Sequence, residues 1–413
     1  MNEQKMVDHL FRHQYGKMVA ILTRLFGLSN LELVEDAIQD TFAQAVQVFG
    51  KAMPENPEAW LTKAAKNRAI DLLRQTKAIK NRHEQYESGP SAILLDDLFL
   101  DHEIEDSQLR MVFTACHPEL QSQDQLSFAL KTIAGFGTRE IAAALLLKEE
   151  TVKKRLSRAR KTVAEKQLAF EIPTAKELPQ RLHRVHEVIY LTFNEGFHSA
   201  NKQQLIREDL CGEALRLCQL LLKKELMRTG EGYALFALLC FHSARLPSRV
   251  NEQNELITLR DQDRSKWHTP LIKMGNSAMR KAMEYEGHSS FQIEAAIAAE
   301  HVQAPSFEET NWEAILSWYE ALELQHPQPL TALNKAIVLL QLKRSAEAKL
   351  LLDKLSPASL EQRAYLHHAT VAEYYTLIGQ VPQAIESLAK ALELVNNESE
   401  RRFLEAKMAQ LRA

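Results

Sequence analysis

The chain has 413 residues, which at roughly 100–200 residues per domain favours two to four domains. Hydrophobic residues make up 45% and charged residues 25%, as in an ordinary globular protein, and a net charge of −3 excludes a general polycation. Any contact with nucleic-acid phosphate must therefore come from local basic patches. Thirteen glycines and thirteen prolines leave few positions that force turns, which favours long helices.

The cysteines show no spacing typical of a metal site, since they form no CxxC pair and no zinc-finger pattern with histidine. We expect them to be small core residues: Cys116, Cys211, Cys218 and Cys240. No apolar run reaches the roughly 18–20 residues that cross a bilayer, and no signal peptide is recognised. The sequence therefore predicts a cytoplasmic protein with reduced thiols and no membrane contact.

Three helices are predicted at the start of the chain, over residues 6–27, 31–49 and about 58–77. In the second helix, apolar residues repeat at helical spacing on one side. The other side carries an acidic face formed by Glu35, Asp36, Gln39 and Asp40. Such a face by itself is usually only a solvated surface.

The third predicted helix places an indole beside cations and an amide. Leu61, Ala65, Ala69 and Leu72 form its inward stripe, and another face carries Trp60, Lys63, Asn67 and Arg74. Stacking on an aromatic ring contributes roughly 1–3 kcal/mol per base, and cations hold the backbone, so this face suits a single nucleic-acid strand. The alternative is that Trp60 belongs to the core and the charges only solvate a surface.

Residues 87–102 are predicted to be a linker, and helical patterns return from about residue 104. Within 138–163, two helices flank a tight turn. An apolar stripe of the second helix would seat it on the first, and its opposite side carries Thr151, Lys154, Arg155 and Arg158. This layout is typical of a helix-turn-helix whose second helix lies in a DNA major groove. The alternative is a solvated cationic helix in an ordinary bundle.

A second boundary is predicted at 169–179, where two prolines occur, and the chain is again helix-rich from there to about 303. The last third has an internal period, because Ala314, Ala348 and Ala384 are separated by 34 and 36 residues. Ala336 and Ala372 mark the preceding helices of two units. This spacing resembles a tetratricopeptide repeat, in which small residues let paired helices approach closely.

Taken in order, three segments resemble the sigma-70 family of bacterial transcription initiation factors, and more narrowly its extracytoplasmic-function (ECF) group. Residues 34–49 are similar to the family's polymerase-binding helix, 56–74 to its promoter-melting helix, and 147–163 to the helix that reads the minus-thirty-five element. Residues 113–120 and 191–196 and the repeat tail resemble a subgroup with a long C-terminal tetratricopeptide extension.

The resemblance implies an all-α fold with two small sigma domains, the second a helix-turn-helix, followed by a helical extension that ends in repeats. The implied boundaries are a region 2-like domain at 1–86, a linker at 87–102, a region 4-like domain at 103–168, a linker at 169–179, a helical middle domain at 180–289 and a repeat domain at 290–413.

The resemblance also implies a transcription initiation factor that binds core RNA polymerase and directs it to promoters. Asp36, Gln39, Asp40 and Phe42 would face the polymerase. The upstream duplex would be held by Thr151, Lys153, Lys154, Arg155 and Arg158, and the melted strand by Trp60, Lys63, Lys66, Asn67 and Arg74. The tail is expected to regulate this activity, either by folding over the sigma portion or by docking a protein or peptide partner.

Other classes of protein remain as alternatives. A helix-turn-helix regulator with a ligand- or protein-sensing tail would not touch polymerase, but it leaves residues 31–74 unexplained. An enzyme is disfavoured, since His183, His186 and Glu187 lack any companion catalytic motif. A repeat scaffold with an incidental basic helix is also disfavoured, because the first 168 residues are too long and too regularly patterned for it. We therefore expect no catalytic residues, no metal and no cofactor.

Overall fold

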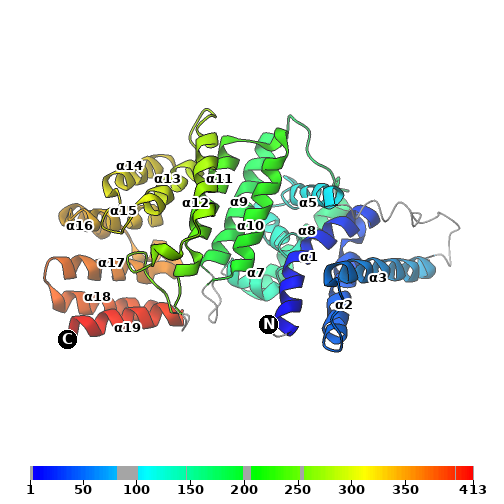
Figure 1. The fold of residues 1–413 in the computed structure, drawn as a ribbon, viewed down its shortest axis with the longest axis horizontal. Helices are drawn as coiled ribbons and strands as arrows, with labels where there is room; N and C mark the ends of the chain where they lie inside the picture. Colours follow the sequence, from blue (N-terminus) through cyan, green and yellow to red (C-terminus); the bar gives the residue numbers. More distant parts are fainter. Residues whose placement is uncertain are drawn as a thin grey trace. The chain divides into compact units, whose positions relative to one another are not determined.

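A computed structural model describes residues 3–80, 101–145, 147–198, 206–251, 255–395 and 397–412. Its regular structure is helical throughout, which confirms the predicted all-α class (Figure 1). Within the described residues, β pairing is limited to one isolated bridge between Val250 and Leu256. None of the described helices has the length and hydropathy that a bilayer span requires.

The chain divides into two compact units, Met1–Phe193 and Asn194–Ala413. Unit 1 contains two groups of helices and most of one further helix, α9. Its elements are α1 (Glu3–Phe26), η1 (Leu28–Asn30), α2 (Leu31–Phe49), α3 (Pro57–Lys80), α5 (Asp101–Ala115), α6 (Ser122–Thr132), α7 (Thr138–Ala144), α8 (Glu149–Glu165) and the first part of α9 (Leu178–Phe197).

Local signals in the sequence account for several helix bounds in unit 1. The bounds of α2 are those predicted, and α3 begins at Pro57, whose fixed φ suits a first helical position. The side chain of Asn56 accepts a hydrogen bond of 3.0 Å from the backbone nitrogen of Ala59, which satisfies a donor of the first turn. The predicted linker at 87–102 lies outside the described residues except for its end, where α5 already begins.

The predicted boundary at 169–179 is not where the molecule divides. The division falls inside α9, because the first part of this helix packs on α5 and α6. Leu182 is buried, Arg181 donates to the backbone oxygen of Phe113, and Arg184 donates to the side chain of Gln125 over 2.7 Å. The start of the predicted middle domain is therefore part of the core of unit 1.

Unit 2 is built around α11, which is buried on nearly all sides, as an apolar helix without a polar face must be. Gly275 lets α12 come close to it, since a Cβ there would lie 2.6 Å from the ring of Phe241. The elements of this part are α10 (Glu208–Lys223), η2 (Glu225–Met227), α11 (Gly230–Ala244), η3 (Leu246–Ser248), η4 (Arg264–Lys266), α12 (Thr269–Ala282) and α13 (Ser290–Gln303).

The C-terminal part of unit 2 is a succession of further helices: α14 (Trp312–Gln325), α15 (Pro329–Gln341), α16 (Ser345–Lys354), η5 (Pro357–Arg363), α17 (Ala364–Leu377), α18 (Val381–Leu394) and α19 (Glu398–Arg412). Ala336, Ala348, Ala372 and Ala384 are fully buried. Leu352 and Leu388, four residues after Ala348 and Ala384, are also buried, whereas Trp318, four residues after Ala314, is 38% exposed. The repeat assignment stays a prediction, and its first unit departs from the other two.

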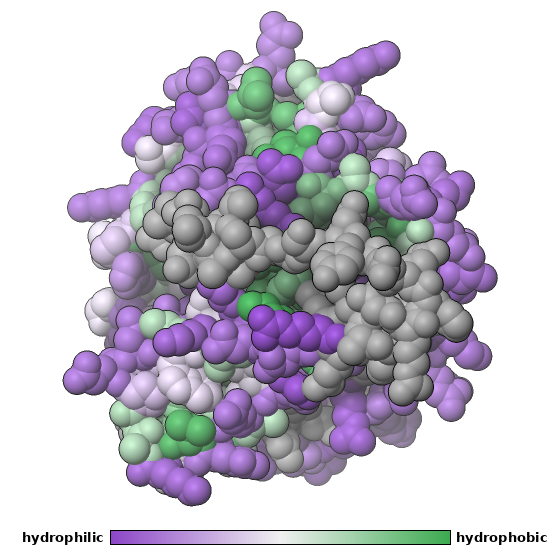
Figure 2. Space-filling view, turned by 90° about the vertical axis from the view of Figure 1, so that its right-hand side faces the viewer, coloured by the Kyte–Doolittle hydropathy of each residue, from purple (hydrophilic) through white to green (hydrophobic). Residues whose placement is uncertain are grey.

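The predicted role of the cysteines is confirmed, because all four are buried and none forms a disulfide. Burial raises the pKa of the Cys116 thiol to about 12. On the face drawn in Figure 2, hydrophilic side chains predominate, and the coloured apolar residues gather only in small separate areas. The helices thus follow the expected pattern of apolar interior and polar surface.

Candidate nucleic-acid interface

Helix α8 presents a cationic face to solvent because its apolar residues are used for packing. Val152, Leu156, Ala159 and Val163 are buried and hold it against α6 and α7. Lys153 and Lys154 are exposed, and neither forms an ion pair within the described part of the chain. These two lysines are therefore available for phosphate, whereas Thr151 is half-buried at the start of the helix.

The two arginines of this face already have partners on α6. Arg158 binds the carboxylate of Asp124 through Nε and Nη2 at 3.1 and 2.8 Å, and these hydrogen bonds raise the pKa of its guanidinium. Arg155 donates to the side-chain oxygen of Gln123 over 2.9 Å. Because Asp124 is only 3% exposed, Arg158 also has a structural role that the pattern of α8 alone does not predict.

The face of α3 predicted to bind a melted strand is largely open to solvent. Lys63, Asn67 and Arg74 are exposed, and Lys66 is half-buried. Trp60 is half-buried, and its ring meets that of Phe49 edge-to-face with centroids 5.2 Å apart. The indole is thus held in place by the end of α2 while part of it stays accessible, as a stacking platform requires.

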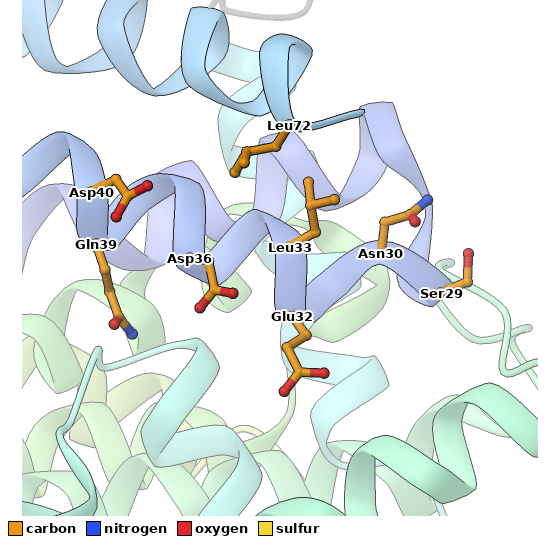
Figure 3. A pocket seen from close by; sticks show the side chains of 8 residues that line it. All are labelled: Ser29, Asn30, Glu32, Leu33, Asp36, Gln39, Asp40 and Leu72. Carbon is orange, nitrogen blue, oxygen red and sulfur yellow. The ribbon is translucent and has the colours of Figure 1, made fainter. Parts of the chain in front are cut away.

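The polar side of α2 borders a groove that is drawn in Figure 3. Leu33 and Leu72 face each other across it, and Asp36 and Gln39 project from the side of α2 away from Leu72. Asp40 is engaged by Arg68 of α3 at 2.7 and 2.9 Å. The groove is lined by Ser29, Asn30, Glu32, Leu33, Asp36, Gln39, Asp40 and Leu72.

Two residues of α2 that were expected at the surface are buried. The family resemblance put Phe42 at the polymerase contact, whereas helical spacing put it on the apolar stripe. The structure agrees with the spacing, because Phe42 is 5% exposed and its ring packs on that of Phe11 with centroids 4.8 Å apart. Glu35 was expected on the acidic face, but it is 2% exposed. Because Glu35 is buried, the exposed polar face of α2 is narrower than predicted.

Glu35 is part of an interface that joins α1 and α2 to the segment α5–α8, which we call the closed interface. The carboxylate of Glu35 pairs with Arg160 of α8 at 2.5 Å and accepts a longer hydrogen bond, 3.5 Å, from the Tyr15 hydroxyl. Burial lowers the pKa of Arg160, but the charge and hydrogen bond of Glu35 outweigh it and leave that pKa raised. Arg24 adds an ion pair with Glu103.

A glycine lets the closed interface pack tightly. A Cβ built on Gly16 of α1 would lie 2.1 Å from the backbone oxygen of Ile133, a distance that no side chain tolerates. Glycine inside a helix costs about 1 kcal/mol relative to alanine. At Gly16 this cost is offset because the backbones of α1 and of the segment at Ile133 can approach closely.

Comparison with known families assigns both groups of helices in unit 1. Residues 10–79 match Sigma-70 region 2, and residues 110–163 match Sigma-70, region 4. Residues 181–283 match a family of unknown function (DUF6596). The chain therefore contains two sigma-70 domains, which supports sigma-factor-like transcription initiation with binding to core RNA polymerase and promoter DNA.

Among curated proteins, the chain is 32% identical over 397 residues to the uncharacterized protein R00370 of Rhizobium meliloti, which covers 93% of this chain and 91% of that one. The two proteins belong to one family over nearly their whole length. The chain is also 27% identical over 155 residues to the ECF RNA polymerase sigma factor SigE of Mycolicibacterium smegmatis, covering 37% of this chain and 58% of that protein. No solved structure matches the chain.

Proposed function

We propose that this chain is an ECF-type sigma factor that reads two promoter elements with separate surfaces of unit 1. The exposed face of α8 holds the upstream duplex, and the exposed face of α3 holds the melted strand. The observation that carries this proposal is the pairing of an accessible, fixed indole at Trp60 with exposed Lys63 and Asn67 on one helix, in a chain that also has a cationic helix-turn-helix.

The groove beside α2 supplies the contact with polymerase in this proposal. Asp36 and Gln39 are exposed there, and Asp36 forms no ion pair within the described chain. A cationic surface of the core enzyme would complement the carboxylates, and such complementarity mainly sets the rate and register of association.

Reading both elements requires the closed interface to open. The minus-ten and minus-thirty-five elements lie about 85 Å apart along a duplex, at about 3.4 Å per base pair. In the structure, α2 and α8 are joined directly by Glu35 and Arg160. The closed arrangement is therefore a resting state, and binding to polymerase holds the two groups of helices apart.

The part of the chain beyond α9 regulates this opening. This proposal is supported by the size of that part and by the lack of a nucleic-acid-binding pattern in its sequence. Residues 181–283 also match a family of unknown function. The test is to compare the full chain with a variant that lacks residues 199–413, which spares α9 and the core of unit 1. Identical promoter-specific transcription and regulation from both proteins would reject a regulatory role.

The second function that the sequence allowed, a DNA-binding regulator independent of polymerase, is tested by a pull-down with purified core polymerase. The sigma proposal expects the chain to be retained by core enzyme. It also expects Asp36→Lys to be retained less. A chain that binds promoter DNA but shows no affinity for core enzyme would favour the regulator instead.

A further inference from the structure

Three arginines of unit 2 lie together without an ion pair to any carboxylate in the described part of the chain. Arg245 follows the last residue of α11, Arg249 follows η3, and Arg264 opens η4. Arg245 is 9% and Arg249 5% exposed, whereas Arg264 is half-buried. No described carboxylate forms an ion pair with any of the three, although Glu308 and Glu309 act on Arg264 at longer range. We call these three side chains the arginine cluster.

Aromatic rings hold the cluster together. The guanidinium carbons of Arg245 and Arg264 lie 5.8 and 4.6 Å from the centre of the same indole, that of Trp267. The guanidinium of Arg249 lies 3.6 Å from the centre of the Phe197 ring. Cation–π contacts of this kind stabilise a cation but leave its charge in place, so the interior of unit 2 stays strongly positive here.

The pKa values of ionisable groups around the cluster are shifted in the direction that a positive potential produces. Burial, followed by the charges of Arg249 and Arg264, lowers the pKa of Arg245 to about 9. Burial and the nearby arginines also lower the pKa values of His242 and His301 to about 3. Both histidines are therefore neutral at pH 7, and the cluster carries its charge without relief from them.

Helix ends account for part of the arrangement. Arg249 donates to the backbone oxygen of Phe197 at the end of α9, and Arg264 donates to the backbone oxygens of His301 and Ala304 at the end of α13, at 2.7 and 2.6 Å. Each helix C-terminus carries roughly half a negative charge, so the two ends balance about one of three cations. Arg245 also lies at the C-terminus of α11, and Glu308 and Glu309 offset part of the charge of Arg264, yet a net positive charge remains around Arg245 and Arg249.

Several donors in the cluster also lack a partner. Arg245 donates through Nε to the side chain of Gln262 over 3.2 Å, and its two terminal nitrogens, which form no hydrogen bond in the described chain, keep some accessible surface. Nη2 of Arg264 and Nδ1 of His301 are fully buried without a hydrogen-bond partner. Buried polar atoms in proteins are rarely left unsatisfied, and buried charges are normally paired.

We propose that the arginine cluster binds a small oxyanion of the phosphate class between Arg245, Arg264 and His301. A phosphate group carries about −1.5 to −2 charges at pH 7 and several strong acceptor oxygens, which matches both the net positive charge and the unused donors. Binding at this site concerns unit 2 alone, so it goes beyond the proposed role in transcription and does not depend on it.

The test is a titration of the full chain with inorganic phosphate while sodium chloride keeps the ionic strength constant. Saturating phosphate should raise the Tm of unit 2 by at least about 5 °C at one hundred times Kd. Arg245→Met should abolish this rise, and without phosphate it should unfold at an equal or higher temperature than the original chain, because an uncompensated charge is removed. A Tm that does not respond specifically to phosphate would overturn the proposal.

Arg260→Met is the matched control. Arg260 lies in the same loop, but it is exposed, stacks on Phe307 and pairs with Glu308 at 3.9 Å. This variant should keep the full phosphate response. A response that persists in Arg245→Met would place the anion elsewhere and also overturn the proposal.

A second measurement needs no variant, so it decides the question even if Arg245→Met does not fold. A bound dianion would raise the pKa of His301, because it offsets the charges of Arg245 and Arg264. Histidine ring resonances of the unsubstituted chain, followed by NMR against pH with and without inorganic phosphate, should show this rise. Unchanged titration curves at saturating phosphate would contradict the proposal.

Discussion

At the scale of single residues, the cationic face of α8 contains two different kinds of side chain. Lys154 has no intramolecular partner in the described chain, whereas Arg158 holds the buried carboxylate of Asp124. Lys154→Ala should therefore weaken holoenzyme binding to promoter and random DNA alike and reduce the salt slope of log K by about 1, with Tm unchanged.

Arg158→Ala should lower Tm as well as promoter affinity, because it leaves Asp124 buried without its cation. Thermal unfolding and fluorescence anisotropy on the two variants measure these effects separately. Equal stability losses for Lys154→Ala and Arg158→Ala would contradict this division of roles.

A second residue-scale prediction concerns acid sensitivity. Burial, with Arg245 and Arg264 nearby, lowers the pKa of His301 to about 3 in the folded chain, against an ordinary value near 6.5. Between pH 6.5 and pH 3, His301 is protonated in the unfolded chain but stays neutral in the folded chain. The free energy of unfolding should therefore decrease as the pH is lowered from 6.5 to 3, by up to about 1.4 kcal/mol per pH unit.

His301→Gln should reduce this slope when urea unfolding of unit 2 is compared at pH 6 and pH 5. The ring of His301 also meets that of Trp312, so the variant's stability at pH 7.5 serves as the baseline. If the slopes of the two proteins are the same, His301 is already protonated in the folded chain.

At the scale of elements, the groove beside α2 is predicted to be the surface that polymerase recognises. Asp36→Lys should weaken binding to core polymerase by at least about tenfold, since a like charge placed against a cationic surface costs several kcal/mol. Gln47→Lys, an equally exposed change farther along α2, is the control. Biolayer interferometry with immobilised core enzyme compares them, and equal losses would argue against the groove.

Helical periodicity was enough to predict most elements and the buried stripes of α2, α3 and α8. It placed Phe42 correctly on the buried stripe, and only the family resemblance put that residue at the polymerase contact. It placed Glu35 wrongly because a helix in the centre of a group has more than one buried side, and spacing does not tell which neighbours will cover it. The partners of Arg158 and Arg160 lie 34 and 125 residues away, beyond any local pattern. Local patterns also do not predict that Arg245, Arg249 and Arg264 lie together, because they belong to separate elements.

At the scale of the whole of unit 1, the closed interface is predicted to compete with polymerase. Arg160→Gln should raise the apparent affinity for core enzyme about tenfold if the pair with Glu35 contributes about 1.4 kcal/mol to closure. Lys161→Gln removes a neighbouring cation whose pair with Glu165 is exposed, so it should have no such effect. Weaker binding by Arg160→Gln than by Lys161→Gln would show that the closed arrangement assists polymerase instead.

The glycine at the closed interface allows an independent check. Gly16→Ala places a methyl group against the backbone of Ile133, so it should separate the two groups of helices without altering α2, α3 or α8. Small-angle scattering should then report a larger radius of gyration. An unchanged radius together with unchanged stability would mean that the interface is not packed as described.

Unit 1 is proposed to direct polymerase to promoters, and the decisive measurement is run-off transcription with purified core polymerase on a library of genomic fragments. We predict transcripts that begin at defined sites only when the chain is present and that are lost when both Lys153 and Lys154 are replaced by alanine. Core enzyme that gives the same transcripts with and without the chain would contradict the claim.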